Sequence, residues 1–398
     1  PLRPSLWSRA ISPRHMGRVW ATADGVATVK AGAGFAADRS VRGPGQAGSR
    51  AAPPLDAAQT RAYDPAMIWH IDPNPYALGP WRPALLGGQE FGIRWYSLPY
   101  IITFLVVYYV LTRAARQRRI PNATPERMED AALLLLLSVM VGGRVGYFLL
   151  NQPSKLLTGQ GWLEMFQIWH GGMAFFGAVA LVVVVDYWYC QRHHISFWHA
   201  TDHVAWIIAI GLGFGRIANF INSELIGIPT GGPWGVVFDS LPPEAWINMT
   251  NPPRHPVQLY SALTHFLLGF WLLYLLRRKP RREFDRVPGF TCFWFLGGYG
   301  LLRFITDFWR VETTWIIPGV FSGGQALSLA LFLLALLGAR LRAEAVRKST
   351  EPCAWYPEEG FTAPLPDECH AYLDAQTAAA SPAPKAAPPA AKPKQRRR

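Results

Sequence analysis

Tyrosine, arginine and aspartate recur at helical spacing inside one apolar stretch of the sequence. Tyr299, Arg303 and Asp307 are each separated by four residues, so in a helix they lie on one face, and Arg310 follows three residues later. Arginine binds planar anions such as phosphate through its fixed fork of N–H groups. This face therefore predicts an anion-binding site suited to a phosphate ester.

Three other apolar stretches carry polar residues in the same way. The first ends in a polar group: Arg216, Asn219, Asn222 and Glu224. The second carries Arg144 between Gly142 and Gly146, and the third opens with the run His255-Pro256-Val257-Gln258-Leu259-Tyr260. Small residues let helices pack closely or let a ligand approach the backbone. Arg303 with Asp307 could form a structural ion pair, and Arg144 could reach a membrane surface, but three such arginines favour one shared site.

These stretches are long enough to cross a membrane. The chain has 398 residues, of which 50% are hydrophobic and 16% charged, whereas soluble domains carry about 25% charged residues. Because a transmembrane helix needs about 20 mostly apolar residues, about seven segments qualify. They are roughly residues 95–111, 131–151, 171–190, 203–222, 256–276, 289–306 and 321–340. We expect an all-α integral membrane protein.

Lysine and arginine are concentrated in the loops after the first, third, fifth and seventh of these segments. Such loops are typically cytoplasmic, so we expect the amino end outside and the carboxyl end in the cytoplasm. Asn222, Glu224, His255 and Arg310 then lie near the outer ends of their spans. Ionisable residues inside a membrane usually serve function, and an anion bound at that depth would be a phospholipid headgroup.

The two ends of the chain differ in composition from the membrane domain expected over residues 67–340. Residues 1–66 and 341–398 contain low-complexity sequence, which predicts disorder for both. Nine Lys or Arg residues in 1–66 would have to lie outside, so we expect the native protein to begin at Met67. The net charge of +13 falls in tails and short loops, which does not indicate a nucleic-acid partner.

The polar motifs, in their order along the chain, resemble those of the prolipoprotein diacylglyceryl transferases. The resemblance covers about residues 67–340 and rests on the following stretches: RWY at 94–96, GRVGY at 143–147, WHGGM at 169–173, GRIANFINSE at 215–224, HPVQLY at 255–260 and GYGLLRF at 298–304. It implies transfer of the diacylglyceryl unit of phosphatidylglycerol to the lipobox cysteine of prolipoproteins. A thioether would form, and glycerol 1-phosphate would leave.

The same resemblance, with the spacing above, assigns the site. The expected catalytic residues are Arg216, Arg303, Glu224 and Tyr299. The expected substrate-binding residues are Arg144, Asn219, Asn222, Tyr96, His255, Gln258, Tyr260, Gly171, Gly172, His170, Asp307 and Arg310. The expected partners are phosphatidylglycerol, lipobox peptides and membrane lipids of the bacterial inner membrane, with no cofactor and no metal.

Two residues depart from the family pattern. Phe176 occupies the place of a usual histidine, and Ser261 that of a usual glutamate. Because the arginines and Glu224 remain, we expect activity, with Glu224 or the arginines handling the thiol proton and His170 as another candidate base.

The alternatives are a non-catalytic phospholipid-binding paralogue and a transporter of anionic solutes. No convincing internal repeat supports the transporter. His199 and His203 are also spaced as a possible metal pair.

Overall fold

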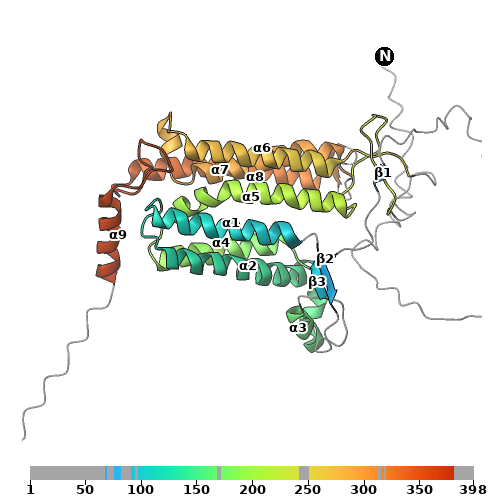
Figure 1. Ribbon diagram of the computed structural model, residues 1–398, viewed down its shortest axis with the longest axis horizontal. Coiled ribbons are helices and arrows are strands. Elements are labelled where there is room, and N and C mark those ends of the chain that lie inside the picture. Colours follow the sequence, from blue (N-terminus) through green and yellow to red (C-terminus); the bar gives the residue numbers. More distant parts are fainter. Residues whose placement is uncertain are drawn as a thin grey trace, which may run out of the picture. The chain divides into compact units, whose positions relative to one another are not determined.

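The computed structural model describes residues 68–69, 76–81, 91–94, 97–167, 172–241, 251–311, 315–317 and 320–380 (Figure 1). The chain divides into two compact units. One contains residues 228–255 and the strand Ile68–Trp69, and the other contains the helices.

Long helices make up the larger unit, and each predicted span overlaps one of them. They are α1 Ser97–Arg116, α2 Pro125–Asn151, α4 Phe175–Arg192, α5 Phe197–Ile221, α6 Val257–Arg277, α7 Phe290–Thr306 and α8 Gly323–Lys348. Two shorter helices, α3 Gly159–Phe166 and α9 Asp367–Ala380, were not predicted. In Figure 1, α5 lies between α1 and α4 on one side and α6 and α7 on the other, in agreement with its contacts.

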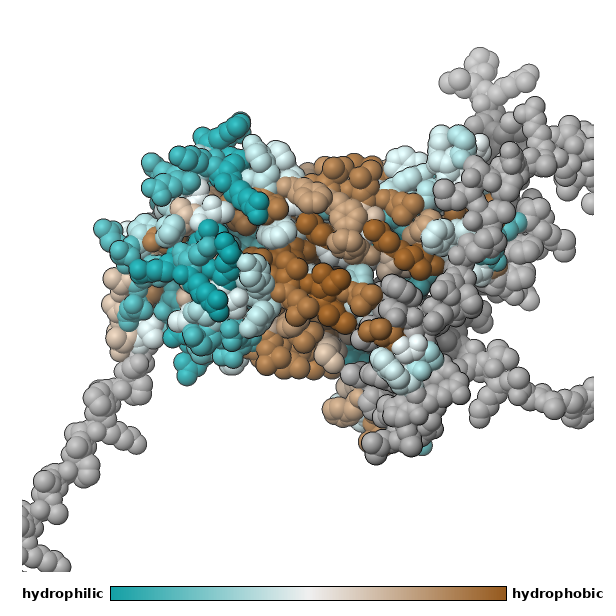
Figure 2. All heavy atoms as spheres, in the orientation of Figure 1, coloured by the Kyte–Doolittle hydropathy of each residue, from teal (hydrophilic) through white to brown (hydrophobic). Residues whose placement is uncertain are grey.

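The outer surface of the helices is strongly apolar. Figure 2 shows hydrophobic residues forming a belt over the middle of the helices, with hydrophilic residues gathered at the end that carries α9. Exposed residues of the belt include Leu137, Val184, Leu263, Phe270 and Leu334. Contiguous apolar surface of this extent marks a membrane or a partner. Five helices, namely α1, α2, α5, α6 and α8, are long and apolar enough to cross a membrane.

Glycines allow two of these helices to lie very close together. A Cβ atom added to Gly142 or Gly146 on α2 would lie 2.6 Å from the backbone of Gly177 on α4. No real side chain tolerates that distance, so only glycine fits at these positions. The predicted role of Gly142 and Gly146 in close packing around Arg144 is therefore confirmed.

Short elements join the helices. The strands of the larger unit form two antiparallel pairs, β2 Tyr76–Trp81 with β3 Phe91–Arg94 and β5 Trp315–Ile317 with β6 Phe321–Ser322. Among the described residues it also contains the 3₁₀ turns η3 Pro153–Leu157, η6 Glu283–Arg286 and η7 Asp307–Trp309.

The smaller unit is built around one parallel pair of strands, β1 Ile68–Trp69 and β4 Val237–Phe238. Val236 and Arg254 exchange both backbone hydrogen bonds, at 3.0 and 2.9 Å. Phe238 and Arg254 are buried, and burial lowers the pKa of the Arg254 guanidinium.

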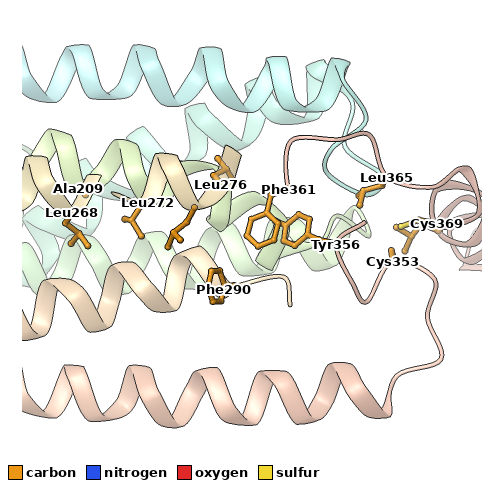
Figure 3. Close-up of a cluster of buried hydrophobic side chains, with 12 residues drawn as sticks. Ala209, Leu268, Leu272, Leu276, Phe290, Cys353, Tyr356, Phe361, Leu365 and Cys369 are labelled. Carbon is orange, nitrogen blue, oxygen red and sulfur yellow. The ribbon is translucent and has the colours of Figure 1, made fainter. Parts of the chain in front are cut away.

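The carboxyl-terminal segment is folded as far as residue 380, whereas the sequence predicts disorder over residues 341–398. Helix α8 continues to Lys348, and the following residues 349–380, which we call the strap, pack into the core of the helical unit. Figure 3 shows Tyr356, Phe361 and Leu365 in one cluster with Leu276 and Phe290 of the helices. The low-complexity sequence misled the prediction because the strap before it carries enough apolar side chains to bury. Residues 381–398 lie outside the described part.

A buried aspartate joins the strap to the start of α7. The Asp202 carboxylate accepts hydrogen bonds from the backbone N–H groups of Gly289 (2.7 Å) and Cys292 (2.8 Å). It thus caps the amino end of α7, where free N–H groups and the helix dipole favour a negative charge. The Tyr356 hydroxyl donates to the same carboxylate at 3.0 Å. Burial and the charge of Asp202 raise the pKa of Tyr356 well above its ordinary value, so its hydroxyl keeps its hydrogen.

Tyr356→Phe should lower the stability of the protein by about 1–3 kcal/mol, because it deletes a buried hydrogen bond to a carboxylate. The thermal denaturation temperature of the protein in detergent micelles measures this. Tyr372→Phe is the matched control, since that hydroxyl bonds only an exposed glutamine, Gln376, among the described residues. Equal stability of the two variants would contradict the role of Tyr356 in holding the strap.

Candidate active site

The chain turns sharply at the end of α5 and brings Glu224 back over the helix. The N–H of Glu224 donates to the carbonyl of Asn219 (2.9 Å), and that of Ser223 donates to Phe220 (3.1 Å). This pair of bonds is a Schellman motif, in which the residue after the C-cap adopts a left-handed conformation. Ser223 does so with φ of 53°, although it is not glycine. Such conformations cost energy and cluster at functional sites.

The turn places three polar side chains of the predicted site together. Asn219 Nδ2 donates to Glu224 Oε2 at 2.9 Å. Gln258 Nε2, from the first turn of α6, donates to the backbone carbonyl of Glu224 at 2.6 Å. Glu224 itself is exposed, whereas Asn219 and Gln258 are buried. Glu224 is therefore held from two helices, with one side of its carboxylate open.

Three residues of the predicted stack, Arg303, Asp307 and Arg310, are neighbours at the end of α7. Arg303 Nη2 lies 3.1 Å from Asp307 Oδ1, with the two side chains 13% and 0% exposed. Arg310 Nη1 approaches the same oxygen at 4.0 Å. The geometry is that of an ion pair without a hydrogen bond, since neither Asp307 oxygen accepts one from the described residues. The carboxylate thus lies between two guanidinium groups.

Arg216, on α5, belongs to the same cluster of charges. Its charge acts on the carboxylate of Asp307, as do those of Arg303 and Arg310. Helices α5, α6 and α7 all contact one another. Three guanidinium charges thus act on the one buried carboxylate of Asp307. Such a cluster favours a bound anion.

Sequence reasoning missed a buried histidine within this cluster. His265 on α6 is 3% exposed, and its ring meets the Tyr299 ring edge to face with centroids 5.4 Å apart. The charges of Arg216 and Arg303 both act on it. Its spacing of seven residues from Gln258, with Ser261 between them, places all three on one face of α6. That spacing was the available signal.

The predicted substrate-binding role of Arg144 stays a prediction, and the structure shows backbone partners for its side chain. Its guanidinium donates to four backbone carbonyls, those of Glu164, Met165, Gln167 and Gly172, at 2.6 to 3.1 Å. Three of these carbonyls lie at the carboxyl end of α3, where a positive charge is favourable. Arg144 therefore anchors the α3 segment to α2.

The remaining predicted site residues fall in several places. Gly172 has φ of +79°, and an added Cβ would lie 2.6 Å from the Tyr147 ring. Tyr260 meets Trp309 edge to face with centroids 6.4 Å apart, and Asn222, the C-cap of α5, is exposed. His255 belongs to the smaller unit, where burial lowers its pKa. Tyr96, His170 and Gly171 lie outside the described residues.

Phe176 and Ser261, the two residues that depart from the family pattern, lie in different surroundings. Phe176 is 58% exposed on α4 and packs edge to face against Phe175. Ser261 is buried on α6, and its carbonyl accepts a hydrogen bond from His265 Nδ1.

His199 and His203 use their Nδ1 atoms within the protein. His199 Nδ1 lies 2.7 Å from Ser196 Oγ, and His203 Nδ1 lies 2.7 Å from the His199 carbonyl. Across the described ranges no group of three or more candidate metal ligands occurs.

Arg144→Lys should loosen the α3 segment, because one ammonium group cannot span four carbonyls and each lost charged hydrogen bond costs about 1.5–3 kcal/mol. Hydrogen–deuterium exchange of residues 159–167 in lipid-free micelles should accelerate. Arg116→Lys, at an exposed arginine, is the control. Unchanged exchange with a loss of phospholipid binding would instead assign Arg144 to the phosphate.

Comparison with known proteins gives one family. The sequence pattern of prolipoprotein diacylglyceryl transferases matches residues 83–340, which excludes the strap. A phosphatidylglycerol–prolipoprotein diacylglyceryl transferase of Ruegeria pomeroyi is 37% identical over 281 residues, covering 66% of this chain and 93% of the relative. An enzyme of the same name from Geobacter sulfurreducens is 35% identical over 275 residues, covering 68% and 95%. One from Bordetella avium is 35% identical over 284 residues, covering 71% and 98%.

Most of the helical unit lies within the family match, and the matched residues include those of the arginine cluster. The three relatives all carry the name of a transferase, which agrees with the catalytic reading of the motifs. This chain belongs to the prolipoprotein diacylglyceryl transferase family.

Proposed function

We propose that this protein transfers the diacylglyceryl group of phosphatidylglycerol to the cysteine thiol of a prolipoprotein lipobox. The thiolate sulfur attacks the glycerol carbon that carries the phosphate. A carbon–sulfur bond forms, the carbon–oxygen bond breaks, and the electron pair leaves with glycerol 1-phosphate. The thiol proton passes to a base.

The observation that carries this proposal is the cluster of Arg216, Arg303 and Arg310 around Asp307. A phosphate diester carries one negative charge, and a second develops on the leaving oxygen as the bond breaks. Preorganised guanidinium groups stabilise such developing charge in a water-poor site. We assign the guanidinium groups of Arg216 and Arg303 to this role.

Glu224 and its partners complement the cluster. Asn219 and Gln258 hold Glu224 with one side of its carboxylate exposed. A carboxylate accepts hydrogen bonds strongly, so Glu224 suits the hydroxyl groups of the glycerol headgroup. Tyr299, beside Arg303 on α7, completes the lining. Tyr96, His170, Gly171 and His255 remain proposed contributors from the family motifs.

The proposed setting is the bacterial inner membrane, with seven spans that include α4 and α7. The basic residues at the ends of α1, α4, α6 and α8 favour a cytoplasmic position for these ends. The arginine cluster, at the opposite ends of α5 and α7, then lies toward the outer leaflet. Both substrates are anchored in the membrane there.

Arg216→Ala and Arg303→Ala should each lower the transfer rate about 100- to 1,000-fold, as expected for loss of a donor to a developing charge. The assay incubates purified protein with phosphatidylglycerol and a lipobox peptide and follows the mass gain on cysteine. Lysine should rescue poorly because it lacks the planar fork. Arg113→Ala, at an exposed arginine on α1, is the control. Near-normal turnover of both alanine variants would refute the proposal that these arginines bind the phosphate.

Phe176→His should change the rate by less than about tenfold, or 1.4 kcal/mol. Phe176 is mostly exposed and touches Phe175, so we expect the protein to work without a histidine there. The same transfer assay measures the effect, with Phe176→Tyr as the control for ring size. A wild-type protein that is inert until Phe176→His restores transfer would show that the chain is a degenerate relative.

A further inference from the structure

His265 presents one ring nitrogen that has no partner in the described part of the protein. Its Nδ1 bonds the carbonyl of Ser261, one turn earlier on α6. A carbonyl oxygen only accepts, so Nδ1 carries a hydrogen, and in the neutral ring the lone pair lies on Nε2. Nε2 is buried and has no hydrogen-bond partner among the described residues. Buried polar atoms in proteins normally have a hydrogen-bond partner, so this nitrogen needs an explanation.

The surroundings of His265 distinguish it from another histidine with the same local geometry. His203 on α5 also bonds the carbonyl one turn earlier and also has a buried Nε2 without a described partner. The guanidinium that acts on His203, however, is that of Arg119, outside the site. His265 touches Tyr299 and lies within reach of the charges of Arg216 and Arg303. Of these two histidines, only His265 therefore lies beside the arginine cluster.

We propose that His265 Nε2 takes the proton from the lipobox thiol, a step that Phe176 cannot perform. This inference rests on the proposed transfer reaction. The sulfur–hydrogen bond breaks, its electron pair stays on sulfur, and the proton moves to Nε2. The thiolate then attacks the glycerol carbon, and the proton can pass to the departing phosphate.

His170, another candidate base, lies outside the described residues, and the arginines and Glu224 are less suited to this step. The neighbouring arginines stabilise the thiolate but cannot accept a proton, because guanidinium groups are always charged in proteins. Glu224 is exposed and already accepts a hydrogen bond from Asn219. His265 combines a fixed ring, a lone pair and a place beside the arginines that stabilise the thiolate.

The test is chemical rescue in the full-length protein. His265→Ala should lower the transfer rate about 100-fold or more, in the range of general-base contributions, while phosphatidylglycerol binding and thermal stability change little. Added imidazole should restore at least tenfold, and more strongly as pH rises. Pyrazole, a ring of the same size but a far weaker base, should not. His203→Gln is the matched control and should stay within threefold of wild type.

The outcomes separate this inference from the proposed function. If the wild-type protein transfers no lipid, the proposed function itself fails. If the wild type is active and His265→Ala keeps more than a third of the rate, His265 is not the base. Equal rescue by imidazole and pyrazole would show that the ring only fills space, and absence of rescue by either would also overturn the inference.

Discussion

An arginine placed inside an apolar bundle must have its charge and its five N–H groups satisfied, and this constraint organises the helical unit. Arg144 meets it by donating to backbone carbonyls, which requires α3 to end beside α2. Gly142 and Gly146 lack side chains, which lets α4 pack closely against α2. Arg303 meets only the charge part of it, through its ion pair with Asp307. The first solution gives the guanidinium four backbone acceptors. The second is a buried ion pair in which neither Asp307 oxygen accepts a hydrogen bond from the described residues.

Control of helix ends is the second requirement, because each end leaves backbone groups that an apolar medium cannot satisfy. At the end of α5, the Schellman turn satisfies carbonyls and also carries Glu224 back to Asn219. At the start of α7, the carboxylate of Asp202 satisfies N–H groups and also receives Tyr356 from the strap. Each cap therefore has a second role. The α5 cap positions Glu224 beside Asn219, and the α7 cap fixes a segment beyond the residues that the family pattern matches.

The helices could be predicted from the sequence because apolar length and helical spacing are local properties. The alignment of Tyr299, Arg303 and Asp307 followed from the same spacing. The role of Arg144 could not be predicted, since it depends on which backbone carbonyls the fold brings to it. His265 was not predicted because a single histidine in an apolar stretch forms no motif of its own, and its face shared with Gln258 was the available signal. The strap was missed because its composition was judged together with the low-complexity sequence that follows it.

The position of a base in a membrane transferase is less constrained than that of a phosphate ligand. A guanidinium must meet a developing charge in a fixed direction, so the arginines have little freedom. A proton acceptor needs only to reach the thiol from one side within hydrogen-bond distance. A chain with Phe176 in place of the usual histidine can therefore carry out the same reaction when another helix supplies an unused ring nitrogen beside the arginines. His265, on the same face of α6 as Ser261, satisfies that condition, and the Ser261 backbone carbonyl orients its ring.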